Sequence, residues 1–322
     1  MLALLAVLAV EAAPFPRLVL PVRCTLGSAC LIQKLPDHGP GPVRADHRCG
    51  TLTTDAHDGV DFRIADNDRF REGVPILAAA AGRVIRTRDG EPDLSIRERG
   101  TTGGRDAGNG VVIDHGGGWT TQYSHARRGS IAVRPGQTVA AGEPIALVGL
   151  SGNTEYPHLH FTVRHDGTAV DPFTSDPITS ACRPGARTGM WRSPLPYQPT
   201  ALVAIGWGAG VRDLAHPARE AVDPAVAPNR PLILWADVIG AAPGDEQLFT
   251  IRSPDGRIVV STRTTIATGG LTWFAVAGRR PPPGGWPAGR YGGRFELRRA
   301  GRLLLNREAD VMMDAPRPPV GL

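Results

Sequence analysis

Residues 108–125 read GNGVVIDHGGGWTTQYSH, and this stretch decides the fold class. A β-branched run over 111–113 and a second run that begins at Trp119 stand on either side of Gly116, Gly117 and Gly118. β-branched and aromatic residues favour extended strands, whereas clustered glycines favour turns. The stretch therefore predicts two neighbouring strands joined by a glycine turn.

The same alternation of short apolar runs and glycine turns continues outward from Val60 to Phe173, with further runs at 82–85, 131–133 and 145–148. We therefore predict a mainly β fold, built on an antiparallel β-sheet. Residues 88–109 interrupt the pattern with a long polar stretch rich in glycine and arginine. Long loops in compact domains tend to be functional or mobile, so this loop is predicted to border a site.

Composition limits the class of partner. The chain has 322 residues and a formal net charge of +5, and Lys34 is the one lysine among 36 basic residues. The arginines are scattered among acidic residues rather than gathered in a dense stripe, which argues against a nucleic-acid partner. No apolar run reaches the roughly 20 residues that a membrane helix needs, so we predict no transmembrane span.

The N-terminus favours export. Leu2–Val10 is a short apolar run followed by small residues, which predicts a signal peptide over 1–13, although the usual basic residues before the run are missing. The alternative is an apolar N-terminal strand. We expect a periplasmic or cell-envelope protein.

Four cysteines in an exported chain favour disulfides. They are Cys24, Cys30, Cys49 and Cys182. Three pairings exist, and sequence alone does not choose among them. Our working hypothesis joins Cys24 to Cys30 and Cys49 to Cys182. A zinc ribbon would need closely paired Cys-x-x-Cys elements, which are absent from the sequence.

The expected organisation has four parts after the signal peptide. We predict an irregular N-terminal extension over 14–50, a first β domain over 51–182, a proline-containing linker over 183–199 and a β-sandwich-like accessory domain over 200–322. The accessory domain is inferred from about seven short strands with regularly spaced turns. These strands are expected at 201–207, 232–238, 248–252, 257–263, 271–277, 294–298 and 303–308.

The chemistry is expected to come from three separated elements of the first domain. His57 and Asp61 are four residues apart, and His158 and His160 are two apart, so each pair shares one face of an extended strand. His125 ends a third polar run. A catalytic zinc site takes three His, Asp or Glu ligands and keeps a fourth position open. Surplus histidines can then move protons or stabilise a developing oxyanion.

Six motifs appear in a fixed order across this region. They are His57-x-x-x-Asp61, Gly82-x-Val84, Gly108-Asn109-Gly110 running to His115, Thr121-x-Tyr123-x-His125, Val133-x-x-Gly136-x-x-Val139-x-x-Gly142, and His158-Leu159-His160-Phe161. In this order the chain resembles the LytM/lysostaphin-type zinc metallopeptidases, over roughly Cys49 to Phe173.

The resemblance implies a role for each matching residue. His57, Asp61 and His160 match the zinc ligands, and His125 and His158 match the two catalytic histidines. The implied activity is hydrolysis of peptide bonds in bacterial cell-wall stems or cross-links. Which histidine is the general base stays open.

Several alternatives accompany this interpretation. The same fold without metal would be a wall-binding or activating module, and an activating protein partner for the enzyme is also allowed. A biotinyl-type carrier is excluded because Lys34 lies outside the carrier-like stretch 133–145. The N-terminal extension or the 88–109 loop could make the enzyme latent. Both a Gly-Gly bridge and a D-Ala-to-diamino-acid cross-link are allowed as substrates, and the oligomeric state stays open.

Overall fold

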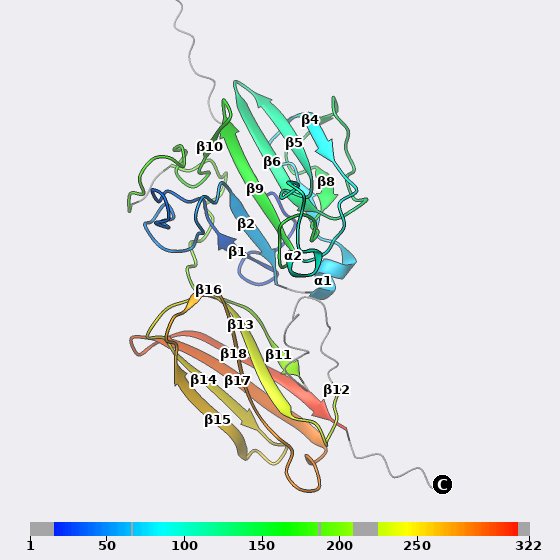
Figure 1. Ribbon diagram of the computed structural model, residues 1–322, viewed down its shortest axis with the longest axis vertical. Coiled ribbons are helices and arrows are strands. Elements are labelled where there is room, and N and C mark those ends of the chain that lie inside the picture. Colours follow the sequence, from blue (N-terminus) through cyan, green and yellow to red (C-terminus); the bar gives the residue numbers. More distant parts are fainter. Residues whose placement is uncertain (1–15, 66, 186–187, 209–224, 315–322) are drawn as a thin grey trace, which may run out of the picture.

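The computed structural model of the protein describes residues 16–65, 67–185, 188–208 and 225–314. The predicted signal peptide lies outside these residues. Within them, no helix has the length and apolar character needed to cross a bilayer. The chain is almost entirely β, as predicted (Figure 1).

The first half of the chain forms an eight-stranded sheet with the order β1-β2-β9-β6-β5-β4-β7, in which β10 pairs with β9. Every pairing in this sheet is antiparallel. A separate two-stranded sheet joins β3 and β8. The elements are β1 (Cys30–Lys34), β2 (Val60–Ile64), α1 (Asn67–Glu72), β3 (Pro75–Leu77), β4 (Gly82–Arg88), α2 (Ile96–Arg99), β5 (Asn109–Gly116), β6 (Trp119–Ala126), β7 (Thr138–Val139), β8 (Pro144–Leu147), β9 (His158–His165) and β10 (Thr168–Val170).

The predicted glycine turn joins β5 to β6. Gly116, Gly117 and Gly118 all have positive φ, at 81°, 58° and 79°. Glycine reaches this region without the steric cost that a Cβ atom imposes. The turn therefore allows β6 to fold back directly onto β5.

The N-terminal extension differs from the irregular chain that we predicted. Residues 30–34 form β1, which pairs antiparallel with β2 at the edge of the sheet. Leu18 and Leu31 are buried in the core of the first domain. The sequence analysis missed this strand because its apolar run is short and is followed closely by the prolines and glycines of 39–42. The extension is thus an integral part of the first sheet.

The predicted linker also packs on the first domain. Met190 and Trp191 are buried in its core, and an isolated parallel β-bridge pairs Trp191 with Leu18. Both disulfides of the working hypothesis form, Cys24 with Cys30 and Cys49 with Cys182. The second joins the N-terminal extension to the end of the first domain.

The C-terminal half contains a three-stranded sheet, β11-β13-β16, and a five-stranded sheet, β12-β18-β17-β14-β15. Their apolar residues share one core, which includes Leu234 and Phe295. All seven predicted strands are present and most are longer than predicted. The elements are β11 (Ala201–Gly208), β12 (Ala225–Val226), β13 (Leu232–Ala241), β14 (Glu246–Arg252), β15 (Ile258–Thr265), β16 (Gly270–Arg279), β17 (Gly289–Arg299) and β18 (Arg302–Met313).

The two halves meet beside β1 and β2, with the second below the first in Figure 1. Arg63 of β2 pairs with Asp237 of β13 at 2.5 Å, and both side chains are buried. Gln33 of β1 donates to Thr272 of β16 at 3.3 Å. Charged and polar contacts therefore connect the second half to the strand that carries Asp61.

Candidate metal centre

The five residues singled out by sequence lie on three adjacent strands and the segment before them. Asp61 on β2 pairs with His160 on β9, and His160 pairs in turn with Ser124 on β6. Directly paired residues in an antiparallel sheet share a face, so these side chains point to the same side. His57 precedes β2, and His125 follows Ser124 on β6.

The first three residues form a compact donor cluster. His57, Asp61 and His160 each offer one ligand atom, and these atoms lie within 4.8 Å of one another. The Oδ1 atom of Asp61 lies 3.1 Å from Nε2 of His57 and 2.9 Å from Nδ1 of His160. Two imidazole nitrogens and one carboxylate oxygen match the donor chemistry of a three-ligand zinc site.

Protein partners on the far side of each ring orient the ligand nitrogens. Nδ1 of His57 donates to the carbonyl of Leu35 at 2.9 Å, which turns Nε2 toward Asp61. Nε2 of His160 donates to Oδ1 of Asp58 at 3.0 Å, which turns Nδ1 toward Asp61. Such outer contacts fix the tautomer and the direction of metal-binding histidines.

Gly59 is required by close packing. A Cβ atom there would lie 2.6 Å from the carbonyl oxygen of Phe161 and 2.8 Å from Nε2 of His160. Any larger residue would therefore displace the His160 ring. The glycine lets the chain turn from His57 into β2 directly against β9.

The two remaining histidines lie beside the cluster. The rings of His125 and His158 are 4.6 Å apart. His125 donates from Nδ1 to the carbonyl of Ser151 at 2.7 Å, and His158 donates from Nδ1 to the carbonyl of Tyr156 at 3.0 Å. Nε2 of His158 faces Asp61 at 3.5 Å. His125 has φ of 61°, a backbone conformation that is uncommon for residues other than glycine.

Burial and charge give these groups different protonation. Burial opposes ionisation of Asp61, but the charges of His57 and His158 and the hydrogen bond from His160 outweigh it and hold the Asp61 pKa well below its usual range. Burial lowers the pKa of His160, yet its bonds to Asp58 and Asp61 raise that pKa to about 9. The cluster therefore holds an ionised carboxylate beside a histidine of raised pKa.

The pKa values of the two flanking histidines move in the other direction. Burial lowers the His158 pKa to about 4, although the Asp61 charge opposes this. Burial, followed by the charges of His158 and His160, holds the His125 pKa well below its usual range. Both rings are therefore neutral at pH 7, and a neutral imidazole can accept a proton.

Two charged residues at the site were missed by the sequence analysis. Lys34 of β1 contacts Oδ2 of Asp61 at 3.2 Å, opposite the oxygen that faces the histidines. Arg164 of β9 contacts Oδ2 of Asp58 at 2.6 Å. Only a predicted pairing of β1 with β2 would have placed the single lysine of the chain here.

The 88–109 loop supports the segment that backs the histidines. Ile96 donates its backbone N–H to the carbonyl of Thr154 at 2.8 Å, and Arg97 pairs with Glu155. Oγ1 of Thr154 lies 3.0 Å from Nδ1 of His158. The loop thus lies next to the predicted site, and latency stays a hypothesis.

Three neighbouring residues have structural contacts. His115 lies 2.8 Å from the carbonyl of Ala81 and from Oγ1 of Thr121. Asn109 is buried and donates to the carbonyl of Glu91 at 2.9 Å. The Tyr123 hydroxyl accepts the backbone N–H of Ala79 at 2.7 Å. These contacts give all three residues structural roles.

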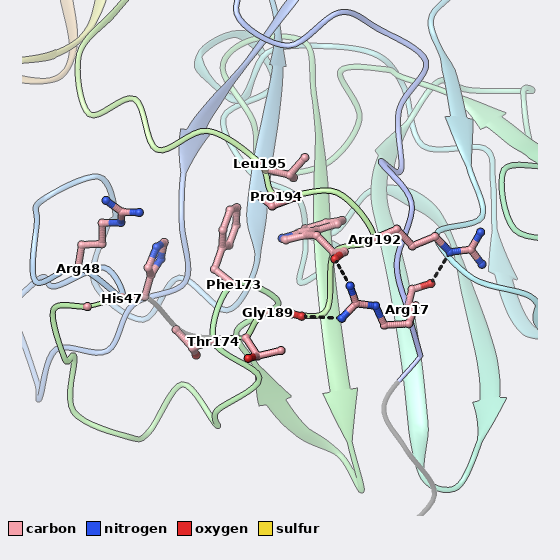
Figure 2. Close-up of a pocket in the computed structure, with 12 residues that line it drawn as sticks. Arg17, His47, Arg48, Phe173, Thr174, Gly189, Arg192, Pro194 and Leu195 are labelled. Carbon is pink, nitrogen blue, oxygen red and sulfur yellow. Dashed lines mark hydrogen bonds between the residues drawn. The ribbon is translucent and has the colours of Figure 1, made fainter.

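A cavity of about 550 Å³ lies on the face of the sheet opposite the donor cluster. Trp191 lines it and packs on Phe62 and Phe161, which alternate with Asp61 and His160 and so point away from the cluster. Figure 2 shows Arg17 bound to Gly189 and His47 beside Phe173 in this cavity. None of the five predicted site residues lines it.

Comparison with known proteins finds a family match over the region that holds these residues. Residues 55–172 match Peptidase family M23, and they include all five predicted site residues. This part of the chain is therefore a peptidase family M23 domain, of the LytM/lysostaphin type expected from sequence.

Three relatives match mainly over this domain. An uncharacterized metalloprotease of Haemophilus influenzae is 34% identical over 42% of this chain and 22% of its own length. The peptidoglycan DD-endopeptidase ShyB of Vibrio cholerae is 32% identical over 41% of this chain and 26% of its own. The murein hydrolase activator EnvC of Escherichia coli is 44% identical over 19% of this chain and 14% of its own. The chain thus spans about a quarter or less of these relatives.

Among solved structures, a zinc containing peptidase from Vibrio cholerae is similar at 27% identity with a TM-score of 0.29. The match covers 46% of this chain and 40% of that chain.

Proposed function

We propose that this chain is a zinc-dependent endopeptidase that hydrolyses peptide bonds in the stems or cross-links of bacterial peptidoglycan. The observation that carries the proposal is the donor cluster of His57, Asp61 and His160 with two neutral histidines at its edge. Similarity to a peptidoglycan DD-endopeptidase supports the substrate class.

His57, Asp61 and His160 would hold the ion. Zinc bound there would supply Lewis acidity, which polarises a peptide carbonyl and makes water a nucleophile near neutral pH. His125 and His158 are the groups available to take up a proton, because each is neutral and has Nδ1 committed to a backbone carbonyl. Once protonated, the same ring can donate to the oxyanion or to the departing amine.

We further infer that the protein works in the cell envelope. Two disulfides support an oxidising compartment. Peptidoglycan peptides are then the expected partners.

A second candidate function is activation of another murein hydrolase, and the similarity to EnvC favours it. This function would need no turnover by the chain itself. The retained donor cluster favours the enzyme over the activator, because an activator has no use for three converging ligand atoms.

The test combines zinc content with release of muropeptides from purified sacculi. We expect one zinc per chain and cleavage by the wild-type protein. His160→Ala should lose both, whereas His158→Ala should keep most of the zinc and lose turnover. His165→Ala is the matched control, since this histidine lies on the same strand and stacks on Trp119 away from the cluster.

Each result separates the alternatives. Zinc without cleavage by the wild-type protein would favour the activator function, and addition of purified murein amidases would then test it. Folded protein that binds no zinc would contradict the enzyme proposal. Equal loss of turnover in His165→Ala would show that the effect is not specific to the site.

A further inference from the structure

A small cavity lies on the same face of the sheet as the donor cluster, two strands further along. Its volume is about 150 Å³, and it is lined by residues of β4, β5 and β6 and by the end of the 88–109 loop. Arg86 and Arg88 lie on its β4 side, and Gln122 and Ser124 lie on its β6 side.

The strand register places the cavity in line with the predicted metal ligands. Arg86 pairs with Val112, Val112 with Gln122, and Gln122 with Thr162 of β9. Thr162 lies two residues after His160 on β9, so Arg86 and His160 share one face of the sheet. Arg88 is three strand spacings, roughly 14 Å, from His160. A peptide crossing the sheet from the cluster would reach the arginines within about four residues, since an extended residue spans roughly 3.4 Å.

The cavity has positive charge without a compensating acid. No carboxylate lines it. Within the described residues, neither Arg86 nor Arg88 has an ion-pair partner. The nearby acids are already engaged, Glu91 by Arg99 and Arg105.

Arg88 is also held in place. Its Nε donates to the carbonyl of Gly108 at 2.6 Å, which fixes the side chain, while its terminal nitrogens have no hydrogen-bond partner among the described residues. Arg86 lies two residues earlier on the same strand, so the two guanidinium groups share a face. Arginine is suited to this role because its planar fork binds both oxygens of a carboxylate.

We propose that Arg86 and Arg88 form a carboxylate-binding subsite of the substrate groove. The inference rests on the proposed endopeptidase function and specifies its substrate class. The preferred peptide has a free carboxylate about four residues from the scissile bond, where an extended peptide that crosses the sheet from the cluster reaches the arginines. An oligoglycine bridge has no side-chain carboxylate, so it would leave both arginines unpaired.

The test uses two versions of one synthetic peptide that has a scissile amide between D-alanine and meso-diaminopimelate and a glutamate about four residues from that amide. One version has the free glutamate carboxylate, and the other has glutamine, a primary amide, in its place. Binding to the full chain is measured by calorimetry in the presence of EDTA, so that turnover does not consume the peptide. Cleavage by the zinc-loaded protein is measured separately.

We expect the free-carboxylate peptide to bind at least about tenfold more tightly than the amide. The double substitution Arg86→Gln, Arg88→Gln should remove this difference and leave binding of the amide unchanged. Arg86→Gln alone should remove part of it, and Arg86 makes no hydrogen bond or ion pair with the described residues that the substitution would disturb. Arg279→Gln, an exposed arginine on β16, is the control for loss of one positive charge and should change nothing.

Equal affinity for the two peptides, no binding of either, or an equal loss for both in the double variant would overturn the inference. The cleavage assay distinguishes this failure from failure of the proposed function. Selective binding without cleavage would contradict the enzyme and leave the subsite in place. Cleavage of both peptides at the same rate would support the enzyme and contradict the subsite.

Discussion

At the scale of single residues, Lys34 has the clearest consequence for metal binding. Its ammonium group forms an ion pair with Oδ2 of Asp61, so Oδ1 is the oxygen that faces the histidines. Removing such an outer partner typically lowers metal affinity by about 10–100-fold. We expect Lys34→Met to weaken zinc binding by about that factor in competition with a fluorescent chelator.

Arg44→Met provides the control, since Arg44 is an exposed basic residue of the same extension. Unchanged zinc affinity in Lys34→Met would show that Asp61 is oriented without the lysine. A loss of affinity in both variants would instead indicate a general effect of charge.

Gly59 illustrates steric control of the same site. A Cβ atom at this position would lie 2.6 Å from a backbone oxygen, and backbone cannot move aside cheaply. Overpacking of this kind costs about 1–3 kcal/mol. We expect Gly59→Ala to lower the free energy of unfolding by about that amount and to weaken zinc binding, because His160 must shift.

Gly292→Ala is the matched control, because an added Cβ there would meet only Oδ1 of Asp310, at 3.4 Å. Denaturant unfolding and zinc titration of both variants measure the difference. If Gly59→Ala binds zinc as the wild type does, then close packing at Gly59 does not position His160.

At the scale of elements, the turn between β13 and β14 is held to the end of β17 by one buried carboxylate. Asp245 accepts two bonds from Arg299, both at 2.8 Å, and one from the backbone N–H of Ala242. Burial opposes its ionisation, but these bonds hold the Asp245 pKa below its usual value. Ionised Asp245 therefore stabilises the fold.

The sign of the pH dependence follows from this lowered pKa. The stabilisation is complete above the unfolded pKa, roughly 3.9, and is lost as the pH falls through the lower folded pKa. We expect Asp245→Asn to cost about 1–3 kcal/mol at pH 7, with a smaller cost below about pH 4. Urea unfolding from pH 3 to 7 measures it, with the exposed Asp166→Asn as control. A cost that does not shrink with acidification would contradict the ion-pair explanation.

Local pattern was enough to predict most strands and the turn between β5 and β6, which the glycines of 116–118 form. Period-two alternation placed His158 and His160 on one face of β9. The prediction that His57 and Asp61 share a strand was wrong, because His57 lies before β2 and reaches Asp61 through the turn at Gly59. Each of these features depends on residues that are close in sequence, where backbone geometry dictates the outcome.

Contacts between distant segments were not predictable in the same way. Lys34 reaches Asp61 only because β1 pairs with β2, and Trp191 is buried only because the segment after the first domain returns to its core. No short-range pattern encodes either pairing. The extension and the linker were therefore predicted as irregular, whereas both are packed parts of the first domain.

At the scale of the whole molecule, the accessory half is joined by a buried ion pair to β2, the strand that carries Asp61 of the candidate metal centre. Arg63 lies two residues after Asp61 on β2, and its guanidinium contacts both Asp237 of β13 and the ring of Tyr156. Breaking a buried pair from one side typically costs about 3–5 kcal/mol, because the other charge is left without a partner. We expect Asp237→Ala to reduce stability by that amount.

The matched control is Asp310→Ala, since Asp310 pairs with Arg290 on the exposed surface of the accessory half and should cost less than about 1 kcal/mol. A second variant, Arg63→Met with Asp237→Leu, should recover at least half of the loss because no charge is then left buried.

Denaturant unfolding of all three variants measures the stability, and zinc affinity measured in parallel shows whether the ion pair affects the position of Asp61. If Asp237→Ala costs no more than Asp310→Ala, the ion pair does not stabilise the contact between the accessory half and the first domain. If stability falls while zinc affinity is unchanged, the ion pair stabilises the interface without positioning Asp61.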